Sequence, residues 1–435
     1  MTTAASAPPL PPAPASPTTR LMNDPTVRGI AALLSVNAVG NGLFLTISTL
    51  WFTQGLGYSV ARVGLALTVA GLCGILASLP AGRACDRWNA RTVLTCLHLL
   101  QAAAVGLYAV ADSFPVFLVL ACLATAGSRA NATARATLYA HVLPVGIRTR
   151  ALALLRAVNN VGIGAGAALG SLLLAFDSDA AYRAAIGVSA AAFLLALIPL
   201  RRIPLTARPP AAKTDVAQTA AARHAAVPGR RAAQPLRDLP YLAVTALNGV
   251  VNTLYVVLEV ALPLWLLTCT SAPRAMVGWL LVTNTALVVA LQVRATRGIT
   301  GPPQAARAFR RGGLLVAAAC LAAACAAHRS PIVAGAVLLA AAVLLTLGEV
   351  SSQAGSWTLS YDLAPDHAHG AYQGVYQTGI SASQAFGPGL LTTLVIPYGT
   401  AGWVALAALF AGAALALPPT ARWAARRSAP LKSTG

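Results

Sequence analysis

Residues 253–267 read Thr-Leu-Tyr-Val-Val-Leu-Glu-Val-Ala-Leu-Pro-Leu-Trp-Leu-Leu, an apolar run that contains one carboxylate, Glu259. The only other glutamate of the 435-residue chain, Glu349, lies in a similar run at residues 336–355. Charged residues make up 10% of the chain, against about 25% in a soluble domain. We therefore expect the chain to reside in a lipid bilayer, where an ionisable group within an apolar run marks a candidate functional site.

Apolar stretches of about 20 residues, long enough to span a bilayer, recur along the whole sequence. The sequence predicts an all-α membrane protein with twelve transmembrane helices, near residues 28–53, 60–81, 91–111, 114–140, 150–175, 181–200, 240–268, 276–294, 309–327, 331–358, 371–396 and 401–420. We expect five regions: a disordered cytoplasmic tail at 1–27, a six-helix bundle at 28–200, a cytoplasmic linker at 201–239, a second six-helix bundle at 240–420 and a cytoplasmic tail at 421–435.

The net charge of +20 would suggest a nucleic-acid partner in a soluble protein. The positions of the basic residues indicate membrane topology instead. If the N-terminus is cytoplasmic, the outer segments carry only Arg62, Arg183, Arg274 and Arg329, and most other Lys and Arg residues are on the inner side. By the positive-inside rule we expect a multi-pass protein of the plasma or inner membrane with both termini cytoplasmic and no nucleic-acid partner.

Residues that could support catalysis or metal binding form no pattern. The seven cysteines contain no Cys-x-x-Cys pair, the six histidines form no metal set, and neither His-Glu-x-x-His nor Gly-x-Ser-x-Gly occurs. We therefore expect no enzyme activity, no metal and no cofactor.

The sequence contains an internal repeat. Asn37 and Asn41 align at a constant offset with Asn248 and Asn252, and the leucine and the aromatic residue that follow each pair also align. Repeats of this kind predict two related halves, and transporters built from such halves bind their substrate near mid-membrane at the interface between them.

Residues 82–91 read Gly-Arg-Ala-Cys-Asp-Arg-Trp-Asn-Ala-Arg and connect the second and third predicted helices. This segment resembles the signature of the major facilitator superfamily, with Gly82, Asp86, Arg87 and Arg91 at matching positions. Asn89 replaces the turn glycine of that signature, and Asn is among the few residues that tolerate a left-handed backbone. The resemblance implies a major facilitator fold across residues 28–420.

The same resemblance implies a conformational latch at this loop. In the family, the aspartate of the signature is thought to hold one state closed by contacting the start of the eleventh helix, here near Ala371. A carboxylate can accept hydrogen bonds from free amides at a helix N-terminus. In the alternative interpretation, Arg83, Arg87 and Arg91 only anchor the loop to anionic lipid.

Residues 162–170 resemble the glycine-rich fifth-helix motif of the drug:proton antiporters of this superfamily, with Gly166-Ala167 where those proteins have Gly-Pro. Small residues at this spacing also allow close helix packing, which accounts for the glycines without an antiporter function.

Polar residues recur at helical spacing within three predicted helices. These stripes comprise Thr245, Asn248, Asn252, Tyr255 and Glu259 in the seventh helix, Glu349, Ser352, Gln353 and Ser356 in the tenth, and Asn37, Asn41 and Ser48 in the first. Lipid cannot satisfy such groups, so they face protein or water. We expect them to line a substrate cavity; hydrogen bonding between helices is the alternative for a single Asn or Ser.

The first half carries the opposite charge. Arg129 and Arg135 lie in the fourth predicted helix and Arg156 in the fifth. Arg135 is close enough to the predicted cytoplasmic end to extend its charge to the surface. Arg129 and Arg156 are candidate cavity residues that either pair with carboxylates of the second half or bind an anionic substrate.

Pro263 predicts a bend at Glu259, because a proline ring removes the hydrogen bond to the carbonyl four residues earlier. Burial disfavours a charged carboxylate, so we expect Glu259 to be the main proton carrier and Glu349 a second proton-coupling residue.

Together these features predict a monomeric, proton-coupled exporter of small amphipathic organic molecules, in the manner of a drug-resistance antiporter. Its expected partners are a small-molecule substrate, protons and the lipid bilayer. The alternative within the same fold is proton-coupled uptake of an organic anion by Arg129 and Arg156. A receptor that moves no solute is a further alternative.

Overall fold

The computed structural model describes residues 21–111, 113–174, 178–204, 234–366 and 368–428. The predicted N-terminal tail as far as residue 20, most of the predicted linker, and the last residues of the predicted C-terminal tail lie outside the described residues.

The described residues are helical and contain no strand. The first half comprises α2 (Pro25–Leu50), α3 (Val60–Trp88), α4 (Ala90–Leu107), α5 (Phe114–Val142), α6 (Val145–Leu174), α7 (Asp179–Leu195) and α8 (Leu197–Arg202). The second half comprises α10 (Leu239–Asn252), α11 (Leu254–Val256), α12 (Leu262–Cys269), α13 (Met276–Ala295), α14 (Pro302–Ala324), α15 (Pro331–Asp362) and α16 (His369–Ser428). The predicted all-helical fold is confirmed.

Ten helices of the described chain are long and apolar enough to cross a membrane. One of them, α16, has a non-helical backbone at Gly399, with φ of 55°, where two helices meet across a kink. The helix α14 carries Arg307, Arg310 and Arg311 and is not among the ten. The prediction of twelve crossings therefore requires that α16 be counted as two helices and that α14 be added.

The last helix extends into the predicted C-terminal tail. Residues 421–428 continue α16 instead of forming a tail from residue 421. The reason is packing, because Ala421 and Ala424 are buried in the core of the second half.

A single residue ends α3 and starts α4. Asn89 has φ of 83°, and its side chain accepts a hydrogen bond from the backbone amide of Arg91 at 3.0 Å. Asparagine adopts this left-handed conformation at lower cost than most residues and also caps helices well. The loop of residues 82–91 is thereby reduced to a tight corner.

The two halves repeat the same local contact. In the first, the indole nitrogen of Trp51 donates a hydrogen bond to the carbonyl oxygen of Tyr108 at 3.0 Å. In the second, Trp265 donates to Ala323, also at 3.0 Å. Each half also has a short π-helix near this position, at Trp51–Gly55 and at Val257–Ala261. These features support the repeat inferred from the sequence.

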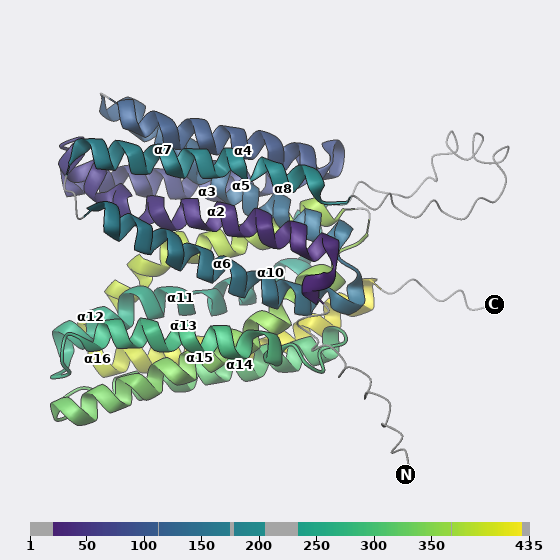
Figure 1. The fold of residues 1–435 in the computed structure, drawn as a ribbon. Helices are drawn as coiled ribbons and strands as arrows, with labels where there is room; N and C mark the ends of the chain where they lie inside the picture. Colours follow the sequence, from purple (N-terminus) through teal and green to yellow (C-terminus); the bar gives the residue numbers. More distant parts are fainter. Residues whose placement is uncertain (1–20, 112, 175–177, 205–233, 367, 429–435) are drawn as a thin grey trace, which may run out of the picture.

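The halves form two bundles that lie side by side, and the described chain begins and ends at the same end of both (Figure 1). Across the interface, α16 packs against α3 and α5, while α6 packs against α13 and α15. At that end Tyr361 of the second half is buried in the core of the first half, among residues such as Leu138 and Leu152.

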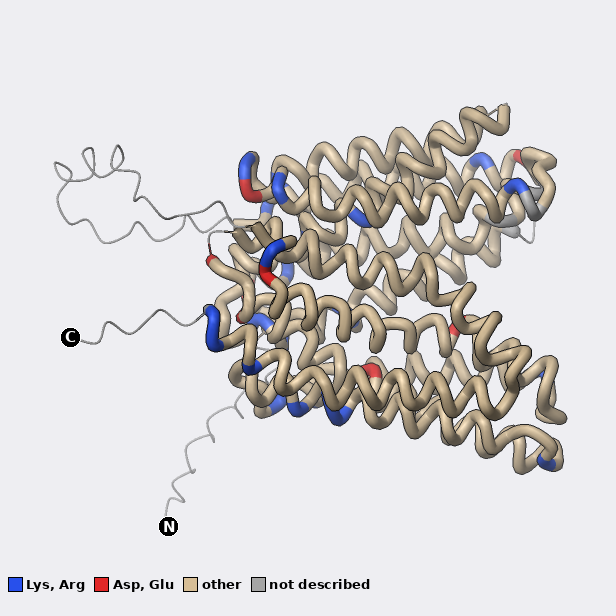
Figure 2. The backbone as a smooth tube through the Cα atoms, turned by 180° about the vertical axis from the view of Figure 1, so that it is seen from behind, with Lys and Arg blue, Asp and Glu red and all other residues tan. Residues whose placement is uncertain are grey.

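The described arginines are concentrated at the end of the molecule where the described chain begins and ends, which we call the basic end (Figure 2). This distribution is the one that the positive-inside rule requires. That the basic end is cytoplasmic stays a prediction.

Candidate functional site

A cavity of about 250 Å³ lies between the two halves. Its first-half walls come from α2, α5 and α6, and its second-half walls from α15 and α16. The lining polar and aromatic side chains are Arg135, Tyr139, Arg156, Asn159, Gln353, Ser356, Trp357, Ser360, Tyr361, Gln373, Tyr376 and Gln377. The location agrees with a site at the interface between repeats.

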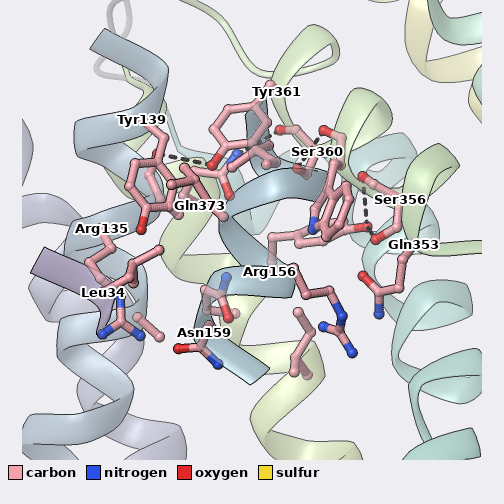
Figure 3. Close-up of a pocket in the computed structure, with 18 residues that line it drawn as sticks. Leu34, Arg135, Tyr139, Arg156, Asn159, Gln353, Ser356, Ser360, Tyr361 and Gln373 are labelled. Carbon is pink, nitrogen blue, oxygen red and sulfur yellow. Dashed lines mark hydrogen bonds between the residues drawn. The ribbon is translucent and has the colours of Figure 1, made fainter. Parts of the chain in front are cut away.

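The side chains divide the cavity into two levels. Figure 3 shows Arg135, Asn159, Arg156 and Gln353 at one level, and Tyr139, Tyr361, Ser360 and Gln373 at the other. The cavity therefore combines one charged, amide-rich level with one formed by aromatic rings and their hydroxyl groups.

The charged level is joined to the second half by a buried ion pair. Nη2 of Arg156 lies 2.7 Å from Oε1 of Glu349 and donates a hydrogen bond to the hydroxyl of Tyr255, also at 2.7 Å. The guanidinium group lies over the Tyr255 ring, 5.1 Å from its centroid. The side chain of Glu349 is 2% exposed, whereas that of Arg156 is 26% exposed. Glu349 is thus enclosed by protein, and Arg156 reaches the cavity.

Neighbouring amides complete this network. Asn284 donates to Oε2 of Glu349 at 2.9 Å, and Gln353 donates to the Tyr255 hydroxyl at 2.8 Å. Both carboxylate oxygens of Glu349 therefore have donors. The Nε of Arg156 is buried and has no hydrogen-bond partner among the described residues, so the guanidinium retains an unused donor.

The charged side chains that line the cavity are both arginines, and the charge of one of them, Arg156, is balanced by Glu349. Arg135 and Arg156 line the cavity, and no aspartate or glutamate does. Arg135 makes no ion pair with a described residue. A guanidinium group matches carboxylate, phosphate and sulfonate oxygens in geometry and charge. The arrangement is suited to holding a small anion.

The two glutamates have different environments. Glu349 is buried in the ion pair, whereas Glu259 is exposed, in the π-helix Val257–Ala261. The sequence predicts a bend at Glu259 because of Pro263, and in the structure Glu259 lies in a π-helical segment instead of regular α-helix. Glu259 is not among the residues that line the cavity.

Of the nine residues predicted to line the cavity, Arg156 and Gln353 do so, and Tyr255 contacts both. The remaining six, Asn37, Asn41, Ser48, Asn248, Asn252 and Arg129, are not among its lining residues. Asn248 accepts a hydrogen bond from Ser356 at 2.9 Å, and Asn252 donates to the carbonyl of Asn248 at 3.0 Å. Asn37 and Ser48 are also buried. For Asn248 and Asn252 the structure thus shows the alternative, hydrogen bonding within and between helices.

Arg129 forms a separate contact between the halves. Its guanidinium donates a hydrogen bond to the side-chain oxygen of Gln384 in α16. The three arginines considered from the sequence thus have three environments: Arg156 pairs with a carboxylate, Arg129 with a neutral amide, and Arg135 faces the cavity.

The halves are held together at the basic end by the loop of residues 82–91. Asp86 accepts hydrogen bonds from the backbone amides of Gly370 at 2.8 Å and Ala371 at 2.7 Å, at the start of α16. Two charge-assisted bonds to free amides at a helix N-terminus are favourable for an anion. The structure therefore contains the contact on which the predicted latch depends.

The other predicted latch residues lie around this contact. Gly82 is packed directly against the backbone of Gly370. Arg91 donates to the carbonyl of Ile203 within the first half, and Arg87 stacks on Trp88 at 5.8 Å. Gly82 and Asp86 thus contact the second half, while Arg87 and Arg91 make these contacts within the first half.

Asp86→Asn is expected to weaken this closure by about 1 kcal/mol, because an amide retains one acceptor but loses the charge and the second bond. Gln373→Cys, in a background without other cysteines, reports access to the cavity from the basic end, and its labelling should become several-fold faster. Asp179→Asn, an exposed aspartate at the start of α7, is the matched control. Unchanged labelling in the Asp86 variant would exclude a latch.

Several lining residues were not predicted from the sequence. Tyr139, Trp357, Tyr361 and Tyr376 are aromatic residues in apolar helices, which have no pattern that distinguishes a cavity wall from a core. Asn159 could have been predicted from the sequence, because it lies one helical turn after Arg156 and therefore on the same face of the helix.

Comparison with known proteins identifies the fold. A model of the Major Facilitator Superfamily matches residues 30–388. Similar solved structures include the human organic anion transporter MFSD10, at 18% identity and a TM-score of 0.65, covering 90% of this chain and 99% of that one. They also include FucP in the outward conformation, at 16% identity and a TM-score of 0.64, covering 92% and 98%.

A bacterial homologue of the iron transporter ferroportin, in an outward-facing state, has 13% identity and a TM-score of 0.69, covering 92% of this chain and 100% of that one. A comparison with curated proteins found no match. The structural likenesses show the fold, and the family match extends over most of the chain. The chain belongs to the major facilitator superfamily.

Proposed function

We propose that the protein co-transports a proton and a small organic anion that has an apolar or aromatic part, by alternating access. The observation that supports this most directly is that two guanidinium groups, those of Arg135 and Arg156, line a cavity that no carboxylate lines. Arg156 is balanced by Glu349, whereas Arg135 has no ion-pair partner among the described residues. This favours the second hypothesis from the sequence, transport of an organic anion, over export of amphipathic molecules in general.

The aromatic residues of the cavity are suited to the apolar or aromatic part of such a substrate. Tyr139, Trp357, Tyr361 and Tyr376 line the cavity and provide aromatic surface for an apolar or aromatic group. The volume of about 250 Å³ lies just below the range of roughly 300–1,000 Å³ that is usual for small-molecule sites. A compact molecule with one anionic group fits these properties.

The ion pair between Arg156 and Glu349 supplies a means of coupling. A proton on Glu349 removes its charge and frees the Arg156 guanidinium for the substrate anion. An anion on Arg156 in turn favours protonation of Glu349, because coupling between two binding events is reciprocal. Proton and anion then bind together and move in the same direction. With an inward proton gradient, the result is uptake.

This proposal assigns proton coupling first to Glu349, which bridges the halves, instead of Glu259. Similar structures include a human organic anion transporter and the fucose:proton symporter FucP, although these likenesses show the fold alone. Proton-coupled export remains the second candidate, with Glu259 in the π-helix as its carrier.

The test uses purified protein in liposomes with an imposed inward proton gradient. A fluorescent naphthalenesulfonate should accumulate inside, and an uncoupler should abolish the accumulation, whereas the cation ethidium should not accumulate. If ethidium loaded into the liposomes were instead expelled as protons enter, this result would contradict the proposal and favour the export hypothesis.

Arg135→Gln should weaken the apparent affinity for the sulfonate roughly tenfold, by loss of a charge-assisted hydrogen bond worth about 1.5 kcal/mol. Arg274→Gln, at an exposed arginine outside the cavity, should leave the affinity unchanged. The affinity is read from the concentration dependence of the initial rate. Equal affinity in both variants would remove Arg135 from the substrate site.

A further inference from the structure

A second cavity, of about 510 Å³, lies within the second half at the basic end, among α13, α14 and α15. Four arginines line it: Arg294, Arg297, Arg307 and Arg311. No aspartate or glutamate is among its lining residues, and none of the four arginines forms an ion pair with a described residue. Four like charges thus share one concave site with no neutralising group among the described residues, so the site attracts anions.

One wall of this basic cavity is apolar. Leu291, Ile299, Leu347 and Val350 line it beside the arginines. A small hydrated anion needs no apolar wall, because leaving water is costly for it. A molecule that joins a phosphate group to a hydrocarbon chain would satisfy both parts of the cavity.

The apolar part of α14 is shorter than the hydrocarbon core of a bilayer, so the arginines of this helix, Arg307 and Arg311, lie near the boundary between hydrocarbon and headgroups. From Gly312 to Ala324, the apolar part of this helix spans about 20 Å at 1.5 Å per residue, while the hydrocarbon core of a bilayer is about 30 Å thick. Arg307 and Arg311 lie immediately before this part. They must therefore extend toward the surface or have headgroups drawn to them.

We propose that the basic cavity binds one anionic phospholipid from the leaflet at the basic end. The phosphate contacts the guanidinium groups of Arg307, Arg311, Arg294 and Arg297, and an acyl chain follows the apolar wall. Basic cavities between membrane helices are suited to this class of lipid. The bound lipid would neutralise charge that the described part of the chain leaves uncompensated. This site is separate from the cavity between the halves and does not depend on the proposed transport function.

Native mass spectrometry of the purified, delipidated chain tests the proposal, with phosphatidylglycerol and phosphatidylcholine of identical acyl chains added in turn. Phosphatidylglycerol should bind at one saturable site with clear preference. Arg307→Gln combined with Arg311→Gln should weaken this binding about 30-fold, at about 1 kcal/mol for each charge. Arg426→Gln combined with Arg427→Gln, two exposed arginines at the end of α16, is the control and should bind normally.

Additional measurements test whether the variants fold normally and whether the ligand is a lipid instead of free phosphate. Thermal unfolding without added lipid should be the same for both double variants, which shows that the lost binding is not lost folding. Leu291→Ser should weaken binding while all four arginines remain. Equal binding of both lipids, an equal loss in the control pair, or displacement by inorganic phosphate at concentrations close to those of the lipid would overturn the proposal.

Discussion

Arg156→Leu is expected to destabilise the protein by about 3–5 kcal/mol at neutral pH, the cost of leaving a buried charge without its partner. Glu349, whose side chain is 2% exposed, would keep the hydrogen bond from the neutral amide of Asn284 but lose the cation that balances its charge. Chemical unfolding in detergent at neutral pH, followed by tryptophan fluorescence, measures this deficit.

Two further variants separate charge from packing. Glu349→Gln should cost less, because Arg156 is 26% exposed and its charge can turn toward the cavity. Arg156→Leu combined with Glu349→Leu should recover much of the stability, since apolar replacement of both partners is often tolerated. Neither variant should move the sulfonate in response to a proton gradient. A deficit in Arg156→Leu no larger than that in Glu349→Gln would contradict a buried ion pair at this position.

The sequence identified the partners of the ion pair but not the pairing. Arg156 and Glu349 were recognised separately as charges in apolar helices, and pairing with a carboxylate and binding of an anion were both considered. Which arginine meets which carboxylate depends on how two bundles pack, and no local pattern encodes that contact. Arg129 illustrates the same limit, because its partner Gln384 is neutral and carries no comparable signal.

Helical periodicity identifies a polar face without showing what that face contacts. The stripe of Asn248, Asn252, Tyr255 and Glu259 was expected to face a cavity. In the structure Asn248 contacts Ser356 of a neighbouring helix, and Tyr255 contacts the ion pair. Apolar surroundings make every such group seek a partner, whether or not the partner is a substrate.

The contact of Asp86 shows where family likeness adds to pattern. The signature at residues 82–91 indicated a contact with a helix start near Ala371, and the structure has hydrogen bonds to Gly370 and Ala371. A long-range contact of this kind cannot be derived from local propensity. That the contact acts as a latch stays a prediction.

Gly82→Ala is expected to prevent this closure, with an effect on the order of 100-fold on the equilibrium between closed and open states at the basic end. A Cβ at Gly82 would overlap the carbonyl oxygen and carbon of Gly370. These are backbone atoms, which cannot move aside as a flexible side chain would. The cost of such overpacking reaches about 3 kcal/mol, which corresponds to this shift.

Gly64→Ala provides the matched control, because it makes the same change in the same helix, α3, where a Cβ would meet no atom within 4 Å. Alanine is the better helix former by roughly 1 kcal/mol, so this control should be neutral or slightly stabilising. Labelling of the Gln373→Cys reporter should be fast in Gly82→Ala and slow in Gly64→Ala. Because the control carries the same gain in helix propensity, a difference between the two variants reports the backbone contacts of Gly82 with Gly370 and Gly374. Equal labelling would mean that the halves do not need this close approach in order to close.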